Sequence, residues 1–280
     1  MIRAVFKGLL ASLVWMSVAA AAAPADIDEL LETSGLNAQL DALPGVIAHS
    51  IEQGIAQSGQ RVPAHHVTAL AAQARADYDP TSLRATVRAA LAALSPADVE
   101  RNLRWLNSDA GRRVTAAEIA AGTTEGVAAM KRFLLTVASD ATGADRRARV
   151  VALDRALHAT ERMVSLQRNA ALSMLVAANA MAPTEMQRSY QELEGIVDQL
   201  MARGGIEQMS GYTQLAMVHT YRNIPDSALD AYLAHLDTAA GQAFAKAVFD
   251  GMEQGIFNAS ARYGRSLIGV LAELASETSS

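Results

Sequence analysis

The sequence predicts an all-α protein made of two tandem, structurally similar repeats of about five to six helices each, preceded by a signal peptide. Hydrophobic residues form 51% of the 280-residue chain but aromatic residues only 5%. The excess is largely alanine, which favours closely packed helices over a sheet. Apolar residues also recur at steps of three and four, the spacing of one helix face.

The second observation is an internal repeat with a constant offset of 130 positions. A shared offset across helix-forming residues indicates one supersecondary unit that is used twice. The matching residues are Leu103, Leu106, Ala110, Gly111 and Ala117 in the first copy, and Leu233, Leu236, Ala240, Gly241 and Ala247 in the second.

The N-terminus has the features of a secretory signal peptide over residues 1–22. An apolar run at 8–18 follows a basic segment, and Ala20 and Ala22 form a small-x-small cleavage signal. The run is shorter than the roughly 20 residues of a membrane span, so we expect a mature chain from Ala23; an uncleaved N-terminal anchor is the alternative. The chain contains no cysteine, which fits an exported protein held by packing alone. We therefore expect a periplasmic location.

The charge balance argues against a nucleic-acid partner. The full chain carries a formal net charge of −5, and loss of Arg3 and Lys7 with the signal peptide makes the mature chain more acidic. After the signal peptide we expect no stable membrane span.

Two helices open the first copy, which we place at residues 23–138. Asp26 supplies an acidic helix start, and Ser34-Gly35 supplies the stop. In the second helix Pro44 lacks an amide hydrogen and its ring crowds the preceding turn, so we expect a kink or a division there. The apolar face of this helix is Leu36, Leu40, Leu43, Ile47, Ile51 and Ile55.

The later helices of the first copy have clear start signals. Pro63, Asp79-Pro80 and Ser95-Pro96 each begin a helix. A turn at Asn107-Ser108 then leads to a last helix that the apolar pattern carries unbroken past Met130.

The second copy, at residues 147–276, follows a polar linker at 139–146 that is nearly free of large apolar residues. It repeats the plan of the first copy. Its third helix is predicted to bury the stripe Met186, Tyr190, Leu193, Val197 and Leu200.

The best-defined short motif is the repeated turn that begins at Trp105 in the first copy and at His235 in the second. Ser108 and Thr238 are expected N-caps, each contributing about 1 kcal/mol. The Ala-Gly that follows allows close approach to a neighbouring helix. Binding of a small anion at this helix N-terminus is the alternative, although Asp109 would repel an anion from the first copy.

Residues 95–111 and 224–241 resemble the exported bacterial proteins grouped as domain of unknown function 2059. That family has a helix with an acidic start after Ser or Thr, an aromatic-rich end, Ser-Pro-Ala-Gly, and a further long helix. Here Asp109 stands where the family often has proline. The resemblance covers about 40 residues of each copy, and it implies an exported all-helical fold in two tandem copies without implying an activity.

No catalytic, metal or cofactor motif is present. His65 and His66 are adjacent and diverge on a helix, and His49 with Glu52 lacks a third ligand. No Gly-x-Ser-x-Gly or cysteine nucleophile occurs. Carboxylate clusters are typical of solvated helix faces, so we expect no cofactor and no metal, while an acid/base pair formed only in three dimensions stays open.

One charge difference separates the copies. Residues 80–113 carry six arginines against three carboxylates, whereas residues 210–243 carry one arginine against three. Drift of solvated surface is the simple interpretation; the functional one is contact with an anionic envelope component or with the acidic copy of another molecule. The candidate binding residues are Arg84, Arg88, Arg101, Arg104, Arg112 and Arg113.

Three functions remain open from the sequence. The first is a non-catalytic periplasmic interaction or ligand-binding protein, which the paired helical scaffold and its inter-repeat groove favour. The second is a hydrolase without a recognisable motif, and the third is an envelope-assembly helper or holdase with exposed apolar surface.

Overall fold

The structure, a computed structural model, describes residues 23–57, 62–136, 143–180, 183–202 and 206–278, with side chains for all of these except 206–208 and 270–278. Every regular element in this part of the chain is helical, which confirms the all-α prediction. The predicted signal peptide lies outside the described residues. In order the elements are α1 (Pro24–Thr33), α2 (Leu36–Gln57), α3 (Ala64–Asp77), α4 (Pro80–Leu91), α5 (Pro96–Leu106), α6 (Asp109–Ala121), α7 (Thr124–Thr136), α8 (Ala144–Leu157), α9 (Ala159–Asn179), the short 3₁₀ turn η1 (Thr184–Met186), α10 (Tyr190–Ala202), α11 (Ile206–Tyr221), α12 (Asp226–Leu236) and α13 (Ala239–Thr278).

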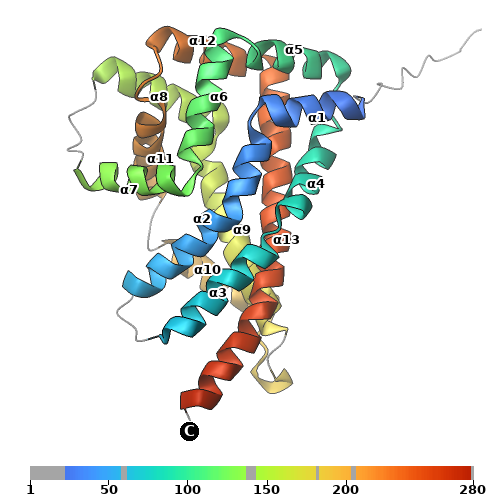
Figure 1. The fold of residues 1–280 in the computed structure, drawn as a ribbon, viewed down its shortest axis with the longest axis vertical. Helices are drawn as coiled ribbons and strands as arrows, with labels where there is room; N and C mark the ends of the chain where they lie inside the picture. The colour runs from blue at the N-terminus through green and yellow to red at the C-terminus, as the bar shows by residue number, and fades with distance from the viewer. Residues whose placement is uncertain (1–22, 58–61, 137–142, 181–182, 203–205, 279–280) are drawn as a thin grey trace, which may run out of the picture.

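The long helix α13 is the central element of the fold (Figure 1). It packs mainly against α9 and α4 and also contacts α3, α5 and α12. The approach is close because glycines face the neighbouring backbones. A Cβ on Gly251 would lie 2.6 Å from Val87 Cα on α4, and a Cβ on Gly264 would lie 2.4 Å from the Met174 carbonyl oxygen on α9.

Both predicted copies contribute to one hydrophobic core. Ile256 and Tyr263 of α13 are buried in the same cluster as Leu30, Leu83 and Leu91 from α1 and α4. The described residues of segments 23–138 and 147–276 therefore share a core. Of the predicted linker, residues 139–142 lie outside the described residues, and α8 already begins at Ala144.

Of the two outcomes expected at Pro44, a kink or a division, the division does not occur, because α2 runs without interruption from Leu36 to Gln57. Pro44 is itself buried, in line with Leu36, Leu40 and Ala48 at steps of four residues. Burial of this continuous stripe stabilises the helix on both sides of the missing hydrogen bond.

The predicted unbroken helix past Met130 is also wrong. α6 ends at Ala121, and α7 begins at Thr124. Thr123 caps α7, since the Gly126 N–H donates to its Oγ1 at 3.0 Å. The positions 130 residues after Gly122 and Thr123 are Met252 and Glu253. Neither residue carries a capping hydroxyl, and α13 continues through both of them.

The stripe predicted for the third helix of the second copy is only partly buried. Leu193 and Val197 are in the core, but Met186, Tyr190 and Leu200 are exposed. Met186 lies in η1, before α10 begins at Tyr190, so helical spacing does not apply to it.

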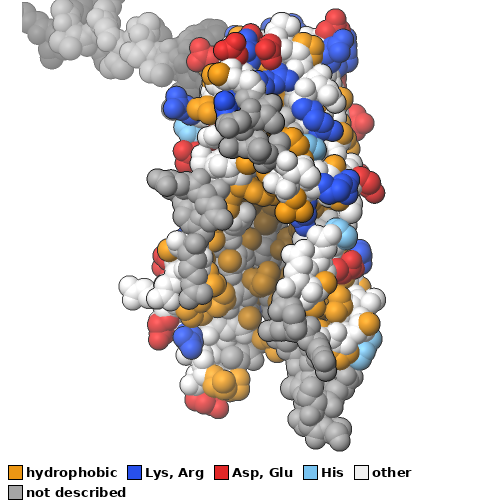
Figure 2. Space-filling model, turned by 90° about the vertical axis from the view of Figure 1, so that its left-hand side faces the viewer, with side chains coloured by type: hydrophobic (Ala, Val, Ile, Leu, Met, Phe, Trp, Pro, Cys, Tyr) orange, Lys and Arg blue, Asp and Glu red, His pale blue; other side chains and the backbone are white. Residues whose placement is uncertain are grey.

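One face of the molecule is hollowed. Figure 2 shows hydrophobic side chains inside a depression in the middle and lower part of the view.

Replacing Gly251 by Ala should destabilise the protein by about 1–3 kcal/mol, because the added Cβ meets the α4 backbone rather than a movable side chain. Urea unfolding followed by circular dichroism measures this. The matched control is Gly195→Ala in α10, where no atom lies within 4 Å of the new Cβ; there we expect a stabilisation of about 0.5–1 kcal/mol. Equal stability of the two variants would contradict the packing described for α13.

Candidate functional site

Two helical hairpins, α5–α6 and α12–α13, form the framework of the candidate site. The Gly111 N–H donates to Ser108 Oγ and the Gly241 N–H to Thr238 Oγ1, each at 3.0 Å. The predicted caps are thus present in both hairpins. A Cβ on Gly111 would lie 2.1 Å from the Trp105 carbonyl oxygen, so only glycine permits this tight turn.

The residues at the ends of α5 and α12 meet each other. The Trp105 and His235 rings, which occupy corresponding positions of the sequence repeat, stack with centroids 4.9 Å apart at 11°. Tyr232 stacks on Trp105 at 5.7 Å, and Tyr221 meets Tyr232 edge to face at 6.4 Å. A continuous aromatic wall therefore joins the two hairpins.

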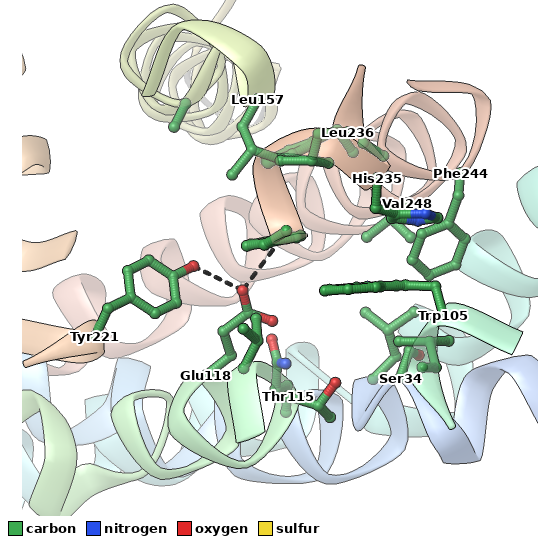
Figure 3. A pocket seen from close by; sticks show the side chains of 18 of the residues that line it. Ser34, Trp105, Thr115, Glu118, Leu157, Tyr221, His235, Leu236, Phe244 and Val248 are labelled. Carbon is green, nitrogen blue, oxygen red and sulfur yellow. Dashed lines mark hydrogen bonds between the residues drawn. The ribbon is translucent and has the colours of Figure 1, made fainter. Parts of the chain in front are cut away.

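A cavity of about 280 Å³ lies beside this wall (Figure 3). Its lining includes five pairs of residues separated by 130 positions, so the cavity lies where the repeated hairpins face each other. The pairs are Trp105 and His235, Leu106 and Leu236, Val114 and Phe244, Thr115 and Ala245, and Glu118 and Val248.

Glu118 is the acidic group of the cavity. Tyr221 and Tyr232 donate their phenolic hydrogens to its Oε1, at 2.7 and 3.3 Å, as the dashed lines in Figure 3 indicate. Burial raises the pKa of the Glu118 carboxyl above its usual value, and the two phenol hydrogen bonds offset part of that increase. Among the lining residues that the structure describes, no Lys or Arg compensates the charge.

His235 is held in its neutral form. Its Nε2 is 3.0 Å from Oδ1 of the fully buried Asn102, whose amide nitrogen donates to the Asp98 and Ala240 carbonyls. Burial lowers the pKa of His235 to about 4. Asn102 therefore fixes the imidazole against Trp105 and ties α5 to the start of α13.

The arrangement is suited to binding more than to acid/base chemistry. Glu118 is bonded to two phenols, whereas His235 is bonded to Asn102. The Ser34 hydroxyl donates to the Leu31 carbonyl at 3.3 Å rather than to a base. Among the described lining residues no nucleophile, base and orienting acid form a connected set.

Two of the six predicted arginines connect helices within the protein. Arg84 donates to Asn37 and to Asp41 of α2, the latter at 2.6 Å. Arg88 forms a two-pronged ion pair with Asp28 of α1. Both side chains are used by the chain itself, and neither lines the cavity.

The other four predicted arginines lie on the outer surface of α5 and α6. Arg101, Arg104 and Arg112 pair with acids one turn away on their own helices, at Asp98, Glu100 and Asp109. Arg113 is exposed. The structure thus places these arginines on the hairpin whose inner side forms the cavity, but not in the cavity.

The histidines considered as metal ligands do not form a metal-binding group in the described part of the chain. His49 Nδ1 lies 3.8 Å from Glu52 Oε2, and Gln53 is the other neighbour of its ring. His65 is exposed and His66 buried, with ring centroids 4.0 Å apart.

The residues that sequence reasoning missed are Glu118, Tyr221 and Tyr232. One signal was available: Glu118 lies in a helix of the repeat at a position where the second copy has the apolar Val248. A carboxylate at a core-facing position of a repeated helix is a stronger indication of a site than a carboxylate on a solvated face.

His235 should remain neutral in NMR titrations of the histidine ring protons down to about pH 4. Because the folded-state pKa of His235 lies below the ordinary 6.5, the neutral ring contributes to the free energy of unfolding above pH 6.5. This contribution is lost as the pH falls toward 4. The free energy of unfolding of the wild-type protein should therefore fall more than that of His235→Gln across this range. A titration midpoint near 6.5 would contradict the buried, Asn102-bonded ring.

Within the described residues, no helix combines the length and apolar character needed to cross a membrane. Comparison with protein-family models, curated proteins and solved structures found no match to this chain.

Proposed function

We propose that this protein is an exported, non-catalytic binding protein that takes a small, mainly apolar molecule into the cavity between its two hairpins. The observation that carries this proposal is the cavity itself. Its lining holds the rings of Trp105, Tyr221, Tyr232, Phe244 and Phe249 around the single carboxyl of Glu118. Ligand sites are typically apolar cavities with a few fixed polar groups.

The separate hydrogen-bond networks of Glu118 and His235 favour binding over hydrolysis. A hydrolase needs a nucleophile or activated water in contact with a base, and the imidazole here is bonded to an amide instead. A connected catalytic set is absent from the described lining, so the hydrolase interpretation is the weaker one.

Export to the periplasm is part of the proposal and depends on the signal-peptide features of residues 1–22. The proposal also includes the two tandem repeats and the resemblance to domain of unknown function 2059. Supporting observations are the equivalent caps at Ser108 and Thr238 and the paired positions that line the cavity.

An envelope-assembly helper or holdase is the second candidate. The apolar depression in Figure 2 favours it, as do exposed large side chains such as Leu135 and Tyr212. A holdase would suppress aggregation of many unfolded clients and would not depend on Glu118.

The tryptophan content allows a direct binding test. Protein lacking residues 1–22 retains one tryptophan, Trp105, in the cavity wall. Fragments with an aromatic ring and one polar group should change Trp105 fluorescence at saturable concentrations and raise the melting temperature. We expect Val248→Phe, which adds a ring inside the cavity, to abolish both effects.

The control is Ala234→Phe, which adds the same ring at an exposed position of α12. It should keep the fluorescence response. Unchanged binding in Val248→Phe, or no response to any fragment in the wild-type protein, would contradict ligand binding in the cavity.

The basic surface of α5 and α6 remains a proposal with its own test. Replacing Arg101, Arg104, Arg112 and Arg113 by Gln should weaken self-association or binding to anionic envelope components at low salt. Wild-type binding should itself decrease as salt rises, because exposed charges are screened. Identical sedimentation and envelope binding of the two proteins at low salt would contradict a role for these arginines.

A further inference from the structure

The carboxyl of Glu118 has one oxygen in use and one available. Oε1 accepts both phenol hydrogen bonds, whereas the structure provides no hydrogen-bond partner for Oε2 among the described residues. The side chain is partly exposed, and it lines the cavity. An acceptor therefore remains for a group that enters the cavity.

The electrostatic character of the cavity favours a positive guest. Of its described lining residues none is Lys or Arg, and the other titratable groups are Tyr221 on α11 and Tyr232 and His235 on α12. Burial raises the pKa of both tyrosines well above 10, and His235 stays neutral down to about pH 4. No positively charged side chain in the described lining offsets a carboxylate at neutral pH.

The aromatic rings around Glu118 also attract a positively charged ligand. Tyr221 and Tyr232 bond directly to the carboxyl, and Trp105 stacks on Tyr232. Aromatic faces carry negative potential and attract ammonium groups, most strongly where water is excluded. A carboxylate beside several rings combines an ion pair with cation–π contacts.

We propose that the ligand is an organic cation: an ammonium group that binds Glu118 Oε2, attached to an apolar body that packs against Trp105, Leu236 and Phe244. This inference rests on the proposed function and specifies its ligand class. The cavity of about 280 Å³ lies near the lower end of small-molecule sites, which suits a one-ring amine.

The positions of the six predicted arginines argue against an anionic ligand. All six predicted arginines lie outside the cavity lining, and five of them pair with carboxylates of this chain. An anion in the cavity would face Glu118 without a compensating charge. Discrimination should therefore follow head-group charge in the order cation, neutral, anion.

Three probes with one ring and different head groups test the inference: 2-phenylethylammonium, 2-phenylethanol and phenylacetate. Their dissociation constants are measured at pH 7.5 by Trp105 fluorescence and calorimetry. The ammonium probe should bind at least about tenfold more tightly than the alcohol, as one charge-assisted hydrogen bond supplies that difference. Phenylacetate should bind most weakly.

The decisive variant is Glu118→Gln, which keeps an oxygen for Tyr221 and Tyr232 but removes the charge. It should lose the preference for ammonium, so that 2-phenylethylammonium binds no more tightly than 2-phenylethanol. The control Glu29→Gln, at an exposed position of α1, should behave as the wild type.

The outcomes separate this inference from the proposed function. Equal binding of the ammonium and alcohol probes by the wild type would overturn the cation inference and leave a binding protein with a neutral ligand. Retention of the ammonium preference by Glu118→Gln would overturn it too. Binding of none of the probes would count against both.

Discussion

The close packing of α13 against α4 and α9 is the constraint on which the rest of the fold depends. Gly251 and Gly264 bring the helix backbones so near that even a methyl group would collide with a neighbouring main chain. Such contact lets alanine-rich helices, which bury little area per side chain, reach dense packing. Ile256 and Tyr263 of α13 then complete a core begun by α1 and α4. The last helix of the chain, α13, therefore completes the hydrophobic core of the first half.

The same helix determines where the cavity lies. α13 starts at the second hairpin, where Thr238 and Gly241 set a tight turn behind His235. Because α13 also lies along α4 and α5, this hairpin is held facing the first one, and the Trp105 and His235 rings stack. Residues that lie 130 positions apart in the sequence thus meet across the interface. Glu118, at the position that corresponds to Val248, puts a carboxyl among described lining residues that include no Lys or Arg. The two hairpins form the cavity, and Glu118 gives it a polarity.

Local signals in the sequence were sufficient for the helical class and for most helix starts. Ser95, Ser108 and Thr238 cap helices as predicted, because an N-cap depends only on a few adjacent residues. The break at Thr123 was a cap of the same kind and was missed because the apolar spacing continued across it. The local cost of Pro44 does not divide α2, because residues on both sides of it are buried along the same helix. Glu118 and its tyrosines come from α6, α11 and α12, so their proximity depends on tertiary packing that spacing along the chain does not encode.

The two halves of the chain contribute to one core, so we expect that neither folds as a separate domain. This expectation is tested by producing residues 23–138 and 143–280 as two polypeptides and measuring helicity and the cooperativity of urea unfolding for each alone and for the mixture. Residues 23–138 alone should lack a cooperative transition, because the Ile256 and Tyr263 side chains are missing from their core, and mixing should restore one. Cooperative unfolding of 23–138 alone, with helicity equal to that of the same segment in the whole protein, would contradict it.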